Sequence, residues 1–206
     1  MKNVLIVLAH PEPKSMNGLL KNKAVDVLTK SGHQVEVRDL YALNFPIEGK
    51  DDNPMFSGDF FDLQQAQSEA QQFNRIPEFI KVEQDKLSWA DLVIFQFPLW
   101  WYSVPAILKS YIDSTFSVGF AYSGNFALEG KEYMLSFTTG APEFLWTEDK
   151  KGTIDQLLFH IDIGVFQMLR MIKLPPFIGY GSKRLSEAQR ENLVDDFGNH
   201  LFKILA

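Results

Sequence analysis

The apolar run from Leu92 to Phe95 constrains the fold more than any other part of the chain. Consecutive branched and aromatic residues suit a strand that is buried on both faces, as in a parallel sheet. Pro98 ends the run, and Pro105 is suited to the first turn of a helix that continues to Asp113. The stretch Ala90–Asp113 therefore predicts a strand, a loop and a helix.

The loop between these two prolines is unusually aromatic. It contains Leu99, Trp100, Trp101, Tyr102 and Ser103. Large aromatic side chains in a connection are exposed to water unless a core, an interface or a ligand covers them. Core or interface packing is one interpretation. We expect instead that this loop binds a flat apolar ligand.

A second strand, loop and helix opens the chain. Val4 to Ala9 is another apolar run, and helical spacing resumes at Leu20 after the loop His10–Gly18. Ser15, Asn17 and Gly18 enter the helix, where free backbone amides favour phosphate. An ordinary turn with Ser15 or Asn17 as the helix N-cap is the alternative. The loop matches neither GxGxxG nor GxxxxGK, and its shape is nearer to that of a flavodoxin phosphate loop.

A third strand is expected from Glu132 to Thr138, followed by the turn Thr138-Thr139-Gly140-Ala141-Pro142. Hydroxyl groups and approachable backbone amides at the carboxyl end of a strand favour ligand binding in open α/β sheets. A plain turn explains Gly140 equally well in isolation.

The remaining pattern completes an α/β fold. We expect strands at His33–Arg38 and Pro175–Tyr180, and helices at Ile76–Trp89, Thr153–Met171 and from the capping box Ser186-x-x-Gln189 onward. Residues 39–75 are predicted to form a surface excursion with a short helix from Leu63, in which some of Phe45, Phe56, Phe60 and Phe61 pack on the body or on a second copy. The fold expected is a flavodoxin-like, doubly wound five-stranded parallel sheet of order 2-1-3-4-5 with helices on both faces. In that order the three loops meet at one crevice.

Composition limits the functions that this chain can have. Its 206 residues suit one domain spanning residues 1–206. A net charge of -6 without a Lys/Arg cluster argues against nucleic acid or an anionic membrane as partner. The sequence has no cysteine, no apolar run of membrane-spanning length and no metal-ligand spacing among its histidines. We expect a cytoplasmic protein whose redox chemistry, if any, requires an organic cofactor.

The motif FQFPLWWYSVPAILK is similar to the signature of the NAD(P)H:quinone oxidoreductases of the DT-diaphorase type and their shorter bacterial relatives. The resemblance covers most of the chain and is poor between Phe45 and Arg75. It implies a flavin, usually FAD with FMN as the alternative, that is held non-covalently at a homodimer interface. It also implies that hydride passes from NAD(P)H through the flavin to a quinone by a ping-pong route.

The resemblance assigns roles to residues that match the family motifs. Cofactor-binding residues are His10, Met16, Asn17, Gly18, Pro98, Leu99, Trp100, Trp101, Tyr102, Thr138, Thr139, Gly140 and Ala141, and Arg190 falls near a family position that reaches the cofactor. Trp101, Tyr102 and Tyr122 match positions that line the site where nicotinamide and quinone alternate.

The sequence departs from the family after Thr-Thr-Gly. The larger members place a Tyr and a His in this loop, whereas this chain has Trp146 and no His there. Negative charge on the reduced flavin must therefore meet other donors. We expect the backbone amides from Thr139 to Ala141 to be the main ones and the Trp146 indole a possible replacement, so the catalytic candidates are Trp146, Tyr122, Thr139 and Gly140.

Other functions fit the same signature. An FMN-dependent azoreductase or nitroreductase and a general flavin reductase are enzymatic alternatives. A flavin-bearing accessory subunit of a potassium-efflux system is a non-enzymatic one. The sequence does not identify the electron acceptor, the preferred nicotinamide nucleotide or the role of residues 45–75.

Overall fold

A parallel sheet forms the centre of the computed structural model, which describes residues 1–46 and 60–205. The strand order is β2-β1-β3-β4-β5, and β6 also pairs with β4. All pairings are parallel. The strands are β1 (Asn3–Leu8), β2 (Gln34–Asp39), β3 (Leu92–Pro98), β4 (Glu132–Thr138), β5 (Ile172–Lys173) and β6 (Phe177–Gly179). The predicted order is confirmed.

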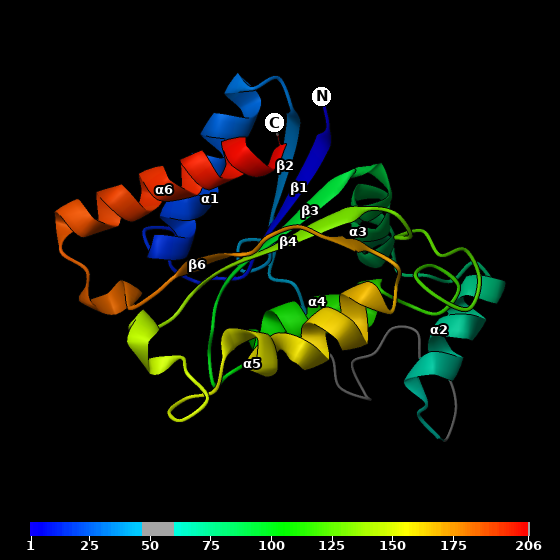
Figure 1. Cartoon of the computed structure of the whole chain (residues 1–206). Helices are drawn as coiled ribbons and strands as arrows, with labels where there is room; N and C mark the ends of the chain where they lie inside the picture. Colours follow the sequence, from blue (N-terminus) through cyan, green and yellow to red (C-terminus); the bar gives the residue numbers. More distant parts are fainter. Residues whose placement is uncertain (47–59, 206) are drawn as a thin grey trace.

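Helices cover both faces of this sheet (Figure 1). One face packs against α1 (Met16–Lys30) and α6 (Glu187–Leu205), and the other against α3 (Glu78–Trp89), α4 (Ala106–Thr115) and α5 (Ile154–Ile161). The helix α2 (Leu63–Gln72) packs through Ala66 and Ala70 against Ile80 of α3. The sheet therefore separates two apolar cores.

The two central strands have no exposed face. Every residue of β3 is buried, and so are the last five residues of β1, because each strand contributes alternate side chains to the two cores. The outer strand β2 is only partly buried. The continuous apolar runs in the sequence thus identified the centre of the sheet.

Proline and capping residues set where the helices begin. Pro77 precedes α3 and Pro105 precedes α4, as expected for residues that fit a helix start but not its interior. The side chain of Ser15 accepts a hydrogen bond from the N–H of Gly18 at the start of α1. The predicted Ser186/Gln189 capping box is confirmed by reciprocal bonds of 2.9 and 3.3 Å.

The last expected strand is shorter than predicted, and a separate short strand precedes it. Ile172–Lys173 and Phe177–Gly179 both lie beside β4 but are separate elements. Pro175 and Pro176 lie between them, and proline has no N–H to continue the ladder. The expected strand at Pro175–Tyr180 is therefore shorter, and a further short strand precedes it.

The long apolar helix expected at Thr153–Met171 also changes form. It is α-helical only to Ile161 and continues as the π-helix η2 (Asp162–Gln167). The buried carboxylate of Asp162 accepts bonds from the Tyr133 hydroxyl and the Lys173 ammonium group. Burial and this carboxylate raise the pKa of Tyr133 well above its ordinary value. A polar residue thus faces the core in this segment.

Part of the expected excursion packs on the body. Phe45 is buried and makes edge-to-face contacts with Phe79 and Tyr111, as predicted. Phe60 is largely exposed, and the expectation for Phe56 lies outside the described residues.

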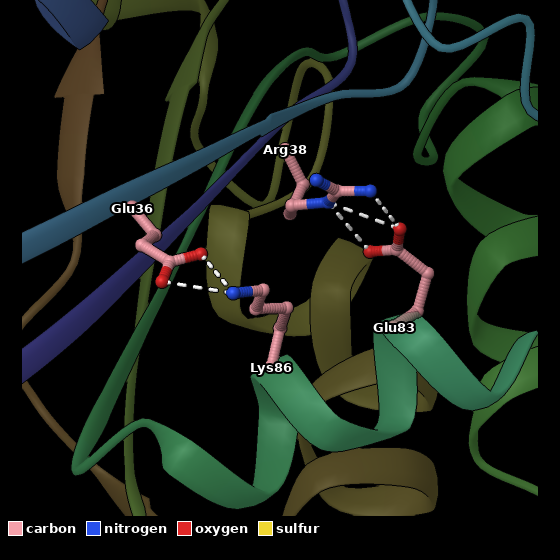
Figure 2. Close-up of polar contacts among 4 residues, drawn as sticks. All are labelled: Glu36, Arg38, Glu83 and Lys86. Atoms are coloured by element: carbon pink, nitrogen blue, oxygen red, sulfur yellow. Dashed lines mark hydrogen bonds and ion pairs between the residues drawn. The ribbon is translucent and has the colours of Figure 1, made fainter. Parts of the chain in front are cut away.

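Two ion pairs attach the outer strand β2 to α3. Figure 2 shows Arg38 opposite Glu83 and Glu36 opposite Lys86. Glu83 is almost fully buried, and Arg38 satisfies both of its carboxylate oxygens. Removal of Arg38 alone would leave a buried charge unpaired, which is costly.

The loops after β1, β3 and β4 lie at the end of the molecule that is opposite both termini (Figure 1). Among the described helices, none is long and apolar enough to cross a membrane.

Candidate active site

A cavity of about 410 Å³ lies where these three loops meet. We call it the crevice. The predicted residues that line it are His10, Met16, Asn17, Pro98, Leu99, Trp100, Thr138, Thr139, Gly140 and Arg190. The predicted convergence of the three loops is therefore confirmed, whereas the ligand-binding roles of these residues stay predictions.

Other predicted residues lie outside the crevice wall. Gly18 allows the backbone of the loop to pack closely against the start of α1. An added Cβ would lie 1.9 Å from the carbonyl oxygen of Pro13. Trp101, Tyr102 and Ala141 adjoin lining residues without lining the crevice themselves. Tyr122 is not brought to this crevice at all. It lines a separate cavity of about 370 Å³ beside α2, α4 and η2.

Basic side chains that sequence reasoning missed surround the crevice. Lys14 and Lys183 line it together with Arg190, and Ser15 and Ser182 add hydroxyl groups. Lys14 is distant in the sequence from Lys183 and Arg190, so the sequence shows no Lys/Arg cluster. A chain with a net charge of -6 thus concentrates positive charge where an anion can bind.

His10 faces the crevice as a neutral donor. Its Nδ1 accepts the N–H of Glu12 at 3.0 Å, so the neutral ring carries its proton on Nε2. Burial lowers the pKa of His10 below its usual 6.5, with Glu12 acting in the opposite direction. The ring lies 5.9 Å from that of Trp100, and this contact links the first two loops.

The turn after β4 is held by one carbonyl group. The oxygen of Ala141 accepts bonds from Thr139 Oγ1 at 2.6 Å, from the Gly181 amide at 2.9 Å and from Trp146 Nε1 at 3.3 Å. The indole N–H of Trp146 is thus already used within the protein. Its ring packs edge-on against Tyr102 at 5.8 Å.

Hydrogen bonds within the protein leave only some of the backbone amides from Thr139 to Ala141 free. The N–H of Thr139 donates to the carbonyl oxygen of Gly179 at 3.0 Å, so Thr139 is not a free donor through its backbone. In the described part of the chain, the N–H groups of Gly140 and Ala141 have no acceptor. These two amides are the ones available to stabilise a negative charge.

The aromatic loop adopts a strained turn. Trp100 and Ser103 form a pair of backbone hydrogen bonds of 3.0 and 3.1 Å, and Trp101 and Tyr102 between them have φ angles of 47° and 62°. Two successive left-handed residues suit Asn-Gly far better than Trp-Tyr. Such strain is characteristic of functional sites. The turn leaves Trp101 98% exposed.

A larger groove of about 1050 Å³ extends from the crevice between α1 and α6. It shares Lys14 and Arg190 with the crevice, and its other walls include Leu19, Asn22, Lys23 and Val194 and the carboxylates of Asp26, Glu187, Glu191 and Asp195. The smaller crevice is the candidate for the chemistry, because Leu99 and Trp100 of the aromatic loop and Gly140, with its free amide, line it. Among the described residues, no group of three His, Asp or Glu side chains is arranged to hold a metal ion.

The fold and the crevice together define a flavodoxin-like protein: a parallel sheet of order 2-1-3-4-5 with a crevice lined by basic side chains at the point where the strand order reverses. A family model described as "Flavodoxin-like fold" matches residues 2–201.

The relatives narrow this class. The ribosyldihydronicotinamide dehydrogenase [quinone] of Mus musculus is 39% identical over 217 residues, which is 98% of this chain and 92% of that protein. The NAD(P)H dehydrogenase [quinone] 1 of Rattus norvegicus is 37% identical over 194 residues, 87% of this chain and 69% of that protein. The structure of a putative quinone reductase from Klebsiella pneumoniae superposes with a TM-score of 0.90 at 34% identity, covering 98% of this chain and 84% of that one. The chain belongs to the NAD(P)H:quinone oxidoreductase family and is an oxidoreductase.

Proposed function

We propose that the crevice binds FAD and that the protein transfers hydride from NAD(P)H through this flavin to a quinone by a ping-pong mechanism. The observation that carries the proposal is that one crevice is lined by three basic side chains, by Gly140 with its free amide and by Trp100 of the aromatic loop, with the free amide of Ala141 next in the chain. Phosphate, an anionic ring edge and a flat ring system require these three features respectively.

The residues present fit a flavin dinucleotide. A Cβ added to Gly140 meets no atom within 4 Å, so this wall leaves room for close approach of a ligand to the backbone. Lys14 and Arg190 border both the crevice and the groove between α1 and α6. These shared cations support FAD over FMN, because they could hold a diphosphate while the adjoining groove has space for an adenosine half.

Each part of the chain has a distinct task in this proposal. The bound flavin would supply the hydride chemistry, accepting hydride from one substrate and giving it to the next. His10, whose Nδ1 accepts the N–H of Glu12, would donate from Nε2 to a phosphate oxygen of the flavin. The Gly140 and Ala141 amides stabilise negative charge without a proton transfer. Trp101 and Tyr102 exclude water from the ring system and form one side of the substrate pocket.

We further propose that the working unit is a homodimer. Trp101, Phe159, Ile163 and Met168 are exposed apolar residues, and Ser103 Oγ lies 3.4 Å from Nε2 of His160 on α5, so the loop and this helix adjoin. Several exposed apolar side chains on neighbouring elements favour an interface. A second copy also explains Tyr122, because it belongs to the substrate pocket in this family and lies outside the crevice of its own chain.

Sedimentation tests the dimer. We expect a dimer at assay concentrations, and we expect Ile163→Lys to produce a folded monomer with much reduced turnover, because a buried unpaired charge opposes association. A wild-type monomer with full activity would contradict this part of the proposal. We also propose a cytoplasmic location, because NAD(P)H is available there.

The cofactor is tested on the purified protein. We expect a yellow protein that releases FAD on denaturation and is bleached by NADH or NADPH. Release of FMN with preferred reduction of azo or nitro compounds would favour the alternative enzymes instead. A protein that stays colourless after incubation with FAD and with FMN would refute all of these functions.

A further inference from the structure

Three buried side chains form a hydrogen-bond chain beneath the crevice. Gln96 Nε2 donates to Asn17 Oδ1 at 2.8 Å, and Asn17 Nδ2 donates to Thr138 Oγ1 at 2.9 Å. Gln96 is on β3, Asn17 is in the first turn of α1 and Thr138 ends β4. Asn17 and Thr138 line the crevice, whereas Gln96 lies below them and is fully buried. The chain therefore connects the interior of the sheet to the ligand site.

The donor-to-acceptor direction of these hydrogen bonds decides whether Thr138 presents a proton or only a lone pair to a ligand. A hydroxyl group has one proton and two lone pairs. Because Thr138 Oγ1 accepts from Asn17, its proton remains for another acceptor. Within the described residues, no protein atom takes that proton. Reversal of the chain would require Thr138 to donate to Asn17 and would present only a lone pair to the crevice.

Gln96 is the residue that sets the direction. Its Oε1 and the Oγ of Ser136, its partner across the β3–β4 ladder, are both buried without a hydrogen-bond partner. Unsatisfied buried atoms are rare and require an explanation, since an apolar side chain of similar size would avoid them. The role of Gln96 as a donor explains why a polar residue is kept at this position. Because its Nε2 donates to Asn17, Asn17 must direct Oδ1 toward Gln96 and Nδ2 toward Thr138.

We propose that Gln96 is a positioning residue that fixes the polarity of the Gln96–Asn17–Thr138 chain and so keeps the Thr138 hydroxyl proton directed at an oxygen acceptor in the crevice. The acceptor is a phosphate or a ring carbonyl oxygen of the ligand. Its identity as part of a flavin rests on the proposed function, whereas the polarity of the chain does not. Gln96 acts through its neighbours and touches no ligand.

Gln96→Glu tests the polarity. A carboxylate only accepts, so Asn17 must turn its amide over and Thr138 must donate to Asn17. We expect the dissociation constants of FAD and FMN to rise at least about tenfold at a pH where the introduced carboxyl group is ionised, as for one lost hydrogen bond to a charged group. When that carboxyl group is protonated, its O–H can restore the original direction. The loss should therefore shrink as the pH falls.

The comparison with wild type at each pH isolates this effect. His10, Lys14, Lys183 and Arg190 are the titratable and charged groups that line the crevice in the described residues, and all are present in both proteins. Gln96→Met removes the donor without inverting the chain, so its loss should be smaller and independent of pH. Ser136→Ala lies on the same face and outside the chain, and it should bind flavin like wild type. Thermal melting without flavin checks that each variant is folded.

The wild-type protein gives a readout that needs no bound ligand. In its NMR spectra we expect the side-chain amide protons of Asn17 to show nuclear Overhauser effects to Thr138, and those of Gln96 to show them to Asn17. Amide protons of Asn17 directed at Gln96 instead would overturn the inference. So would equal losses in the Glu and Met variants at every pH, because these indicate a merely structural role. If the wild type binds neither FAD nor FMN, the proposed function fails, and the NMR result still decides the polarity.

Discussion

Gly18 and Gly140 occupy the same site region for different physical reasons. Gly18 has the carbonyl of Pro13 against it, whereas Gly140 faces open space and its φ is outside the left-handed region. We predict that Gly18→Ala lowers the free energy of unfolding by about 1–3 kcal/mol through overpacking. Gly140→Ala should change it by less than about 0.5 kcal/mol.

Gly140→Ala should weaken flavin binding although it leaves the free energy of unfolding almost unchanged. The added methyl group projects into space that we assign to the ligand, so the dissociation constant should rise at least about tenfold, equivalent to about 1.4 kcal/mol. Denaturant unfolding and flavin fluorescence titration measure the two quantities. An unchanged affinity in a stable Gly140→Ala protein would remove the turn after β4 from the binding site.

Trp146 offers a second test at the level of one residue. Its indole N–H is one of three donors to the Ala141 carbonyl oxygen, so it stabilises the turn instead of facing a ligand. We predict that Trp146→Phe slows flavin reduction only a few-fold, because two donors remain and Phe keeps a ring beside Tyr102. Stopped-flow reduction by NADPH, at verified flavin occupancy, measures this. A loss of roughly 10²-fold would show instead that Trp146 is a principal donor to developing charge.

Among the elements of the site, the turn Trp100–Ser103 has a strained backbone that lowers stability and is expected to serve turnover. Trp101 has φ 47° and is 98% exposed, so it incurs backbone strain without packing in the monomer. We predict that Trp101→Asn raises the free energy of unfolding by about 1 kcal/mol and weakens quinone turnover. The control is Trp101→Tyr, which keeps both the strain and an aromatic ring and should resemble wild type. Lower stability in Trp101→Asn would mean that this turn is not strained.

The elements that the sequence predicted well are those with one dominant physical cause. Continuous apolar runs located β1 and β3, and Pro77 and Pro105 located the starts of α3 and α4. The errors had two causes. Pro175 and Pro176 were included in the last expected strand, although proline cannot donate to a ladder and this signal is local in the sequence. The bonds from Tyr133 and Lys173 to Asp162 in the π-helix are tertiary contacts, so periodicity alone does not reveal them.

At the scale of the whole molecule, the sheet order brings the three predicted loops into one crevice. The sequence identified the loops because each follows a recognisable strand. It did not reveal that Lys14 and Lys183 line the same crevice, since they approach only after folding, and it did not separate Tyr122 from the crevice of its own chain. The Gln96–Asn17–Thr138 chain likewise joins three elements that are distant in sequence.

The proposed ping-pong route requires NAD(P)H and quinone to react with the bound flavin in turn. Anaerobic double-mixing stopped-flow tests it most directly, because each half-reaction is then observed with only one substrate present. We predict that NADH or NADPH bleaches the flavin absorbance before any quinone is added. Quinone, added after oxidised nucleotide has been removed, should restore the full absorbance. Bleaching that requires both substrates together, or a reduced flavin that quinone does not reoxidise, would rule out the ping-pong route.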